Sequence, residues 1–295
     1  MFSGIFTPVI TAFHEDGIDY DAQATLVEKL IASGVDGILF CGSIGEFQAM
    51  TVAERKAFFQ WAASAVNGRV KVLAGTGGTC VNEVMDLTDH ARQAGFDGAV
   101  VISPFYFILG DHDLYRFYMS VASIGLPVML YNFPDRTNVS LSANLVRKLA
   151  KDCPAIVGIK DTVDNISHTR EIIAAVKPVR SDFSVLSGFD EYMVPNLMAG
   201  GDGILTGLTN VAPDLFVSML KAWKQGDIEE LCRGQKRVNL LMQLYGITKP
   251  FIAAIKCAME MIVPGTPACL RAPFGAVEER QRKAIKLLLE QAGVL

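Results

Sequence analysis

Short apolar runs recur along the chain, and most are followed by a segment with the hydrophobic spacing of a helix. The runs repeat at roughly 20 to 35 residues, which is the length of one strand–helix unit. They are almost continuously apolar, which is typical of parallel strands covered on both faces. The eight predicted strands are Gly4–Thr11, Gly37–Gly42, Val70–Gly75, Gly98–Ser103, Pro127–Asn132, Ile156–Asp161, Phe183–Gly188 and Gly203–Gly207.

The segments between the runs are amphipathic, as in DAQATLVEKLIASG and SANLVRKLAKDC. Thr51 and Glu54 have the spacing of a capping box and predict the start of the second helix. Eight strand–helix units in a row favour the α/β class and, within it, a closed (β/α)8 TIM barrel. An open doubly wound sheet is the alternative architecture.

After about Asp214 the chain contains helical patterns only, interrupted by the linker-like segment PGTPACLRAPFG. We therefore expect residues 1–225 to form the barrel and residues 226–295 to form a C-terminal helical extension.

Composition narrows the functional classes. The chain has 295 residues, is 51% hydrophobic and has a net charge of -4. Lys and Arg are scattered, so no nucleic-acid partner is expected. Neither a signal region nor an apolar stretch long enough to span a membrane is present, and we expect a soluble, cytoplasmic protein. Six cysteines without a C-x-x-C pair are typical of buried, reduced thiols. The four histidines lack metal-ligand spacing, so no metal site is expected.

Lys160 ends the apolar run IVGIKD, where a buried ammonium would be costly to desolvate. Side chains alternate along a strand, so Gly158 and Lys160 share one face, and Asp161 on the other face cannot neutralise the lysine directly. We expect Gly158 to leave room below it. An amine kept dry and uncharged is a nucleophile that forms imines with carbonyl compounds. The alternative is a structural lysine whose charged end reaches water at the barrel rim.

Tyr131 ends the preceding predicted strand and should neighbour Lys160, about 5 Å away across the ladder. A phenol there can shuttle the protons that imine formation requires. The alternative is a half-buried aromatic with a satisfied hydroxyl.

The turn Gly42–Gly45 follows the second predicted strand. Its flanking glycines allow successive backbone N–H groups to converge on an anion such as a carboxylate, and Ser43 adds a hydroxyl. A purely structural turn is the alternative.

Further along, SPFYFILG (Ser103–Gly110) is unusually apolar for a loop, which indicates a lid or a subunit contact. Arg136 is either a loop charge paired with Asp135 or a clamp for a carboxylate.

These residues together give the chain a resemblance to the dihydrodipicolinate synthase / N-acetylneuraminate lyase family of class I, pyruvate-handling aldolases. It extends from GIFTPVITAF through GSIGEF, LYNFPDRTN and GIKDT to LSGFDEYMVPNLMAGGDGILTGLTNVAP. The combination of Y-N-x-P with a following G-I-K-D/E is its most specific part.

The resemblance implies a role for each matching residue. Lys160 would be the Schiff-base lysine and Tyr131 the proton-relay tyrosine, with Ser43 and Tyr106 as further catalytic members of the relay. Ser43 takes the first hydroxyl position of the turn that holds the 2-oxo acid carboxylate, and Ile44 replaces the second, keeping only its backbone N–H. Tyr106 aligns with a tyrosine that reaches into the neighbouring subunit, which implies a homodimer or homotetramer. Arg136 and Leu205 would also bind substrate, Arg136 through the carboxylate of the aldehyde partner. No cofactor or metal is implied.

For the substrate, the resemblance is mixed. Arg136 favours a 4-hydroxy-tetrahydrodipicolinate (dihydrodipicolinate) synthase-like condensation of pyruvate with an anionic aldehyde such as aspartate semialdehyde, which is our first expectation. Asn138 and the GTGGT and LYNFP stretches look more like 2-keto-3-deoxygluconate aldolases. An aldolase or dehydratase acting on a sugar-derived 2-keto-3-deoxy acid is therefore the alternative. A barrel that binds a small ligand without converting it is the third possibility, against which Lys160 and Tyr131 argue.

Overall fold

A computed structural model describes residues 2–14 and 17–295 of the chain. Within these residues, eight strands close into a barrel in the order β1-β10-β9-β8-β7-β6-β5-β4. Adjacent strands such as β1 and β4, β6 and β7, β7 and β8, and β8 and β9 pair in parallel. The (β/α)8 barrel is therefore confirmed, and the open sheet is excluded. The barrel strands are β1 (Gly4–Pro8), β4 (Gly37–Phe40), β5 (Lys71–Gly75), β6 (Gly98–Ile102), β7 (Val128–Asn132), β8 (Ile156–Asp161), β9 (Ser184–Ser187) and β10 (Gly203–Leu205).

All eight predicted runs contain a barrel strand; β5, β7 and β8 reach the last residue of their runs, and the other five strands end before it. Every residue of β6 and of β7 is buried, as continuous apolar runs require. The antiparallel pair formed by β2 (Phe13–His14) and β3 (Gly17–Ile18) was not expected, because two-residue strands leave no periodicity in a sequence.

Helices separate the barrel strands. The capping box predicted at Thr51 is present, because the backbone N–H of Glu54 donates to Thr51 Oγ1 and that of Thr51 to the Glu54 carboxylate.

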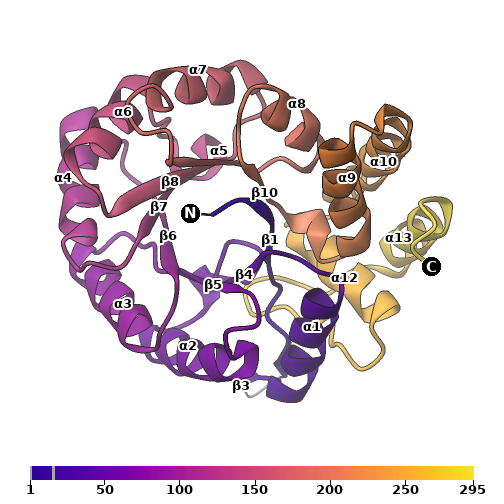
Figure 1. The fold of residues 1–295 in the computed structure, drawn as a ribbon. Coiled ribbons are helices and arrows are strands. Elements are labelled where there is room, and N and C mark those ends of the chain that lie inside the picture. Colours follow the sequence, from indigo (N-terminus) through magenta and orange to yellow (C-terminus); the bar gives the residue numbers. More distant parts are fainter. Residues whose placement is uncertain (1, 15–16) are drawn as a thin grey trace. The chain divides into compact units, whose positions relative to one another are not determined.

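In Figure 1, α2, α3, α4, α6 and α7 lie outside strands β5–β8. The helices are α1 (Tyr20–Ala32), α2 (Val52–Val66), α3 (Val81–Gln93), α4 (Asp111–Ala122), α5 (Pro134–Thr137), α6 (Ala143–Asp152), α7 (Ile166–Val176), α8 (Met193–Met198), α9 (Pro213–Gln225), α10 (Ile228–Leu241), α11 (Leu244–Ile247), α12 (Ile252–Ile262) and α13 (Glu279–Gln291), with 3₁₀ turns η1 (Phe47–Ala49), η2 (Asp190–Tyr192) and η3 (Gly207–Thr209).

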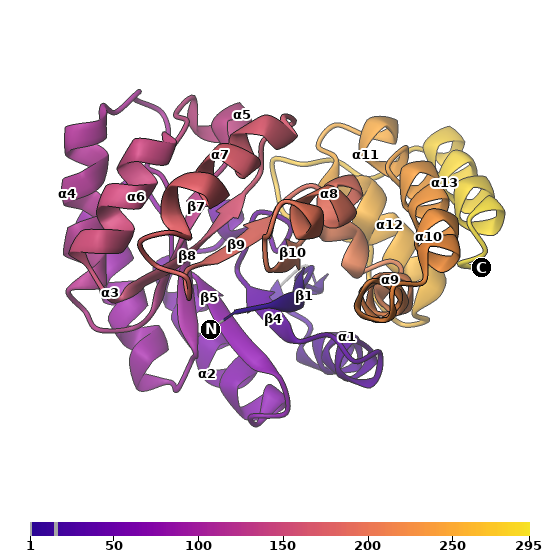
Figure 2. The ribbon, with the colours of Figure 1, turned by 45° about the horizontal axis from the view of Figure 1, so that its top comes forward.

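The chain divides into two compact units. The first contains the N-terminal residues up to Gly4 and Thr51–Leu205, and the second contains Ile5–Met50 and Thr206–Leu295. In the second unit, α10 packs on α9 and α13 packs on α12 (Figure 2). The region after Asp214 is helical, as expected. The boundary between residues 225 and 226 stays a prediction.

Two expectations about the chain as a whole can be compared with the structure. No single helix in the described ranges has both the length and the apolarity to cross a membrane, although the bent pair Ile228–Ile247 and Ile252–Ile262 meets the two criteria jointly. All six cysteines lie within the described part of the chain, and none of them forms a disulfide there. The expectation that they are buried is confirmed for Cys41 and Cys257 only, because Cys153 is half-buried and the other three, Cys80, Cys232 and Cys269, are exposed.

Candidate active site

Lys160 and Tyr131 lie side by side at the ends of β8 and β7. They are direct partners in the parallel ladder, and Lys160 Nζ lies 4.2 Å from the centroid of the Tyr131 ring. Both side chains are buried, with 5% and 4% of their residue surfaces exposed. Lys160 Nζ makes no hydrogen bond or ion pair within the described residues. The predicted adjacency is confirmed, and the amine stands against an aromatic face instead of a carboxylate.

Asp161 points away from Lys160, as strand alternation requires. Its carboxylate is buried and accepts hydrogen bonds from Asn132 Nδ2 at 2.8 Å and Thr169 Oγ1 at 2.6 Å, and it pairs with His168 Nδ1 at 3.0 Å. Asn132 in turn accepts from the backbone N–H of Leu141 at 2.9 Å. The second ladder pair, Asn132 with Asp161, therefore ties β7, β8 and α7 together directly behind the first pair, Tyr131 with Lys160.

His168 is a member of this network that the sequence did not reveal, because nothing in the spacing of four scattered histidines links one of them to Asp161. The hydrogen bond with Asp161 raises the pKa of His168, and partial burial opposes the shift. The other ring nitrogen lies 3.2 Å from the carbonyl of Leu141.

Gly158 does not leave the free space that we expected below Lys160. A Cβ at this position would lie 2.7 Å from the carbonyl oxygen of Ser184 and 2.9 Å from its Cβ, and 3.4 Å from Met129 Cε. Ser184 is the direct partner of Gly158 in the β8–β9 ladder. Glycine is required here because β9 approaches too closely for any side chain.

Arg136 lies in the short helix α5, immediately after β7. The residue is exposed, its guanidinium lies 5.3 Å from the centroid of the Phe133 ring, and Nη1 donates to the backbone carbonyl of Asp135 at 3.1 Å. The Phe133 ring in turn stacks on Tyr131 at 5.8 Å. A chain of stacked groups thus connects Arg136 with Tyr131.

The apolar loop after β6 is exposed at its tip. Tyr106, Phe107 and Ile108 expose 83%, 73% and 76% of their surfaces, and the two rings meet edge to face at 5.0 Å. Tyr106 has a φ of 89°, which is strained for a residue with a side chain.

In the second unit, the turn after β4 carries the residues expected to bind a carboxylate. Ser43 is half-buried, and Ile44 and Gly45 are buried. Thr11 Oγ1 donates to the carbonyl of Gly45 at 2.7 Å, and the backbone N–H of Glu46 donates to the carbonyl of Ser43 at 3.3 Å. Within the described residues, the backbone N–H groups of Ile44 and Gly45 have no acceptor. Two successive unpaired N–H groups on buried residues are the donor set that an anion-binding nest presents.

Left-handed residues flank this turn on both sides. Cys41 has a φ of 55° and Glu46 a φ of 56°, and neither is a glycine. Such a conformation costs about 1–3 kcal/mol and persists where the surroundings impose it, which is frequent at binding sites. Ile44 also packs closely on Gly207, because a Cβ added to that glycine would overlap with Ile44 Cδ1. Leu205, the last residue of β10, is fully buried in the first unit.

A second buried lysine, Lys256 of α12, was not singled out in the sequence. It is fully buried and forms an ion pair with Glu46 at 2.6 Å, so its ammonium is neutralised by a carboxylate, unlike the Lys160 amine. Burial lowers the pKa of Lys256, and Glu46 opposes the shift.

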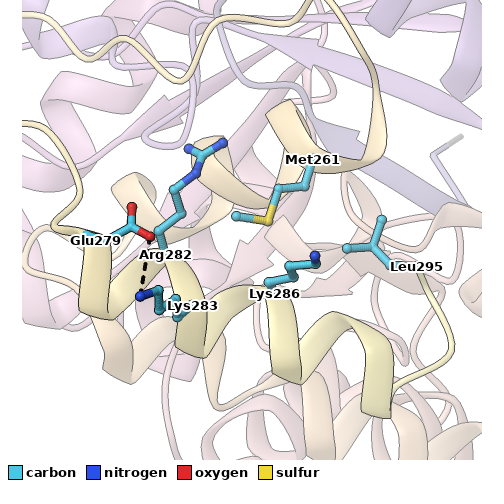
Figure 3. A pocket seen from close by; sticks show the side chains of 6 residues that line it. All are labelled: Met261, Glu279, Arg282, Lys283, Lys286 and Leu295. Carbon is cyan, nitrogen blue, oxygen red and sulfur yellow. Dashed lines mark ion pairs between the residues drawn. The ribbon is translucent and has the colours of Figure 1, made fainter.

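One pocket and the arrangement of possible metal ligands can be compared with these residues. A pocket of about 510 Å³ lies on α12 and α13 in the second unit (Figure 3) and is lined by Met261, Glu279, Arg282, Lys283, Lys286 and Leu295. Its charged side chains come from one helix and pair with each other or with close neighbours, as Lys283 does with Glu279. Across residues 2–14 and 17–295, no group of three or more His, Cys, Asp or Glu side chains could hold a metal ion.

Comparison with known proteins gives matches over nearly the whole chain. The sequence model of the dihydrodipicolinate synthetase family matches residues 1–292. A putative 2-dehydro-3-deoxy-D-gluconate aldolase, YagE of Escherichia coli (strain K12), is 40% identical over 293 residues, covering 99% of this chain and 97% of the relative. A probable 2-dehydro-3-deoxy-D-pentonate aldolase of the same organism, YjhH, is 39% identical, with 100% and 98% covered.

A 4-hydroxy-tetrahydrodipicolinate synthase of Endomicrobium trichonymphae is 32% identical, with 100% of both chains covered. Among solved structures, the crystal structure of YagE from E. coli K12 in complex with pyruvate superposes with a TM-score of 0.98 at 39% identity and covers 100% of both chains.

Proposed function

Because this chain belongs to the dihydrodipicolinate synthetase family, it is a lyase of the pyruvate-dependent aldolase type, and we propose that it cleaves a sugar-derived 2-keto-3-deoxy acid to pyruvate and an aldehyde. The observation that carries the proposal is the dry Lys160 amine, without a counter-ion among the described residues, next to the Tyr131 ring.

In this proposal, the lone pair of the Lys160 amine attacks the keto carbon of the substrate. Loss of water then gives an imine, which draws electrons from the bond between the third and fourth carbons. As that bond breaks, the fourth carbon loses its hydroxyl proton and leaves as an aldehyde, and the remaining enamine takes a proton at the third carbon. Hydrolysis of the imine releases pyruvate and restores the amine.

Tyr131 is proposed to carry the protons in these steps. Imine formation needs a proton delivered to the departing hydroxyl, and bond cleavage needs one removed from the sugar hydroxyl. Tyr131 is the direct ladder partner of Lys160, and the resemblance assigns the same role to it. Tyr106 is proposed to contribute to the relay across a subunit contact.

The substrate carboxylate is proposed to bind the backbone N–H groups of Ile44 and Gly45, with the Ser43 hydroxyl as a further donor. The unpaired state of the two N–H groups supports this assignment. Leu205 is proposed as an apolar wall for the substrate, since it is buried and has no polar side-chain atom.

The sequence identities to the relatives reverse the order in which we rank the two candidate substrates. Relatives named as sugar-acid aldolases are 40% and 39% identical, whereas the synthase is 32% identical. Condensation of pyruvate with aspartate semialdehyde remains the second candidate, because Arg136 follows β7 on an exposed helix and could bind an anionic aldehyde.

The exposed Tyr106, Phe107 and Ile108 support a homodimer or homotetramer, because three adjacent apolar side chains at a loop tip are rarely left in water. This assembly and a cytoplasmic location stay predictions. Light scattering of the wild type and of Phe107→Ser tests the assembly: a monomeric wild-type protein contradicts it.

Two assays test the proposal directly. With pyruvate and borohydride, the wild-type protein should gain the mass of one reduced pyruvate, and Lys160→Ala should gain none, while Lys71→Ala, an exposed lysine, serves as the matched control. Pyruvate release from 2-dehydro-3-deoxy-D-gluconate and -pentonate should exceed condensation with aspartate semialdehyde in kcat/KM. The reverse ranking selects the synthase, and the absence of any adduct rejects the imine mechanism.

A further inference from the structure

A buried charged cluster holds the turn that follows β4. Glu46 Oε1 accepts from Lys256 Nζ at 2.6 Å, and Glu46 Oε2 accepts from the backbone N–H of Arg271 at 3.1 Å. The side chains of Glu46 and Lys256 are both 0% exposed. Both oxygens of the carboxylate are therefore occupied, and Glu46 is not available as a general base.

Two further contacts attach the cluster to its surroundings. Lys256 Nζ also donates to the carbonyl of Cys269 at 2.5 Å, and Arg271 Nη1 donates to the carbonyl of Ala49 at 3.2 Å, at the end of η1. The Lys256 and Arg271 charges lie 4.6 and 4.4 Å from the centroid of the buried Phe13 ring. Groups from two separate parts of the second unit, α12 and the segment before α13, thus contact one glutamate side chain.

Such a cluster is not explained by stability alone. A buried ion pair recovers its desolvation cost poorly, and well-packed apolar residues of similar volume often serve as well or better. What an ion pair supplies is a unique geometry, and Glu46 needs one because it holds a left-handed backbone conformation that a non-glycine residue rarely adopts. The N–H groups of Ile44 and Gly45, which have no acceptor in the part of the chain that the structure describes, belong to the two residues directly before it.

The negative charge of Glu46 gives a second reason for its ion pair with Lys256. An unneutralised Glu46 carboxylate would repel any anion that approached the neighbouring N–H groups, and the repulsion would be strong because the region is dry. The Lys256 ammonium cancels that field while remaining fully buried, so it does not itself offer a binding site to solvent.

We propose that Glu46, Lys256 and Arg271 are positioning residues that hold the Ile44 and Gly45 N–H groups in the orientation that receives the carboxylate of the 2-oxo acid, and that Lys256 removes the repulsion that Glu46 would exert on it. This inference rests on the proposed function. It assigns to α12 and the segment before α13 a part in carboxylate recognition and none in the imine chemistry.

The test compares two ketones that differ in the carboxylate. Borohydride trapping is titrated with pyruvate and with acetone in the wild type, Glu46→Gln, Lys256→Met and the exposed control Lys71→Met. For Lys256→Met, the half-saturating pyruvate concentration should rise on the order of tenfold, the size of a typical coupling between two sites. The acetone titration and the maximal extent of trapping should not change. Glu46→Gln keeps an acceptor for the Arg271 N–H and removes the negative charge, so its shift should be smaller.

The outcomes are separable. Equal shifts for pyruvate and acetone, or no shift in either variant, overturn the inference and leave the proposed function standing. Wild-type protein that forms no adduct with either ketone overturns the proposed function itself. If Lys256→Met does not fold, Glu46→Gln decides: a pyruvate-specific shift supports the inference, and its absence overturns it. In steady state, the same variants should raise KM for the keto acid substrate and leave kcat nearly constant.

Discussion

Replacing Asp161 by alanine tests whether the network behind the candidate site holds the two strands that carry Tyr131 and Lys160. The substitution removes the acceptor of Asn132 Nδ2 and Thr169 Oγ1 and the partner of His168 Nδ1. Hydrogen bonds to a charged group contribute about 1.5–3 kcal/mol each, and donors left buried without a partner add to the loss. Because the lost contacts share one carboxylate and are not additive, we expect a loss of about 3–5 kcal/mol in the free energy of unfolding.

Urea denaturation followed by circular dichroism measures this loss. The control is Asp152→Ala, whose carboxylate is partly exposed and bonds to Tyr115 at 3.0 Å, so that its removal should cost at most about 1 kcal/mol. In the same preparation, kcat should fall by about tenfold or more, since displacing a catalytic pair by a fraction of an ångström is costly. If Asp161→Ala loses no more stability than Asp152→Ala, the network does not hold the strands. If stability falls but kcat does not, the network is structural only.

Three further predictions concern single residues. Hydrogen bonding to Asp161 raises the folded-state pKa of His168 above its unfolded value of about 6.5, so the stabilisation from this pair should be fully present below about pH 6.5 and be lost as pH rises through the folded pKa. Denaturation midpoints from pH 5 to 9 should show this loss in the wild type and not in His168→Gln; parallel profiles would refute it. Tyr131→Phe should lower kcat by about 10²–10⁴-fold and barely alter the melting temperature, and an unchanged kcat in steady-state assays would remove the relay role. Gly158→Ala should cost about 1–3 kcal/mol by thermal denaturation because its Cβ would meet the Ser184 carbonyl at 2.7 Å, whereas Gly246→Ala, with nothing within 4 Å of the added Cβ, should cost almost nothing; equal melting temperatures would mean that β9 can move aside.

Some sequence expectations failed for a common reason. Gly158 was expected to leave space, and it is instead the point at which β9 packs closest on β8. The alternation of side chains along a strand predicts which face of the strand a residue occupies. The distance from that residue to the next strand depends on side chains elsewhere in the chain. The exposed cysteines have the same explanation, since a residue type sets an average burial and the fold sets the actual one.

The sequence by itself determined the succession of strands and helices and the Tyr131–Lys160 pair. Both depend on short-range rules: continuous apolar runs mark buried parallel strands, side chains alternate along a strand, and consecutive strands of a barrel are neighbours. Ladder pairing of Tyr131 with Lys160 follows directly from these rules once the strand ends are known.

Only the tertiary structure decided which buried lysine is neutralised and what holds the turn after β4. Lys256 and Glu46 are 210 positions apart, and no local pattern relates residues at such a separation. Their contact exists because the chain returns to the same place after the barrel is complete, and because a charge removed from water must find an opposite charge there. The link between His168 and Asp161 is likewise a product of how α7 packs on β8.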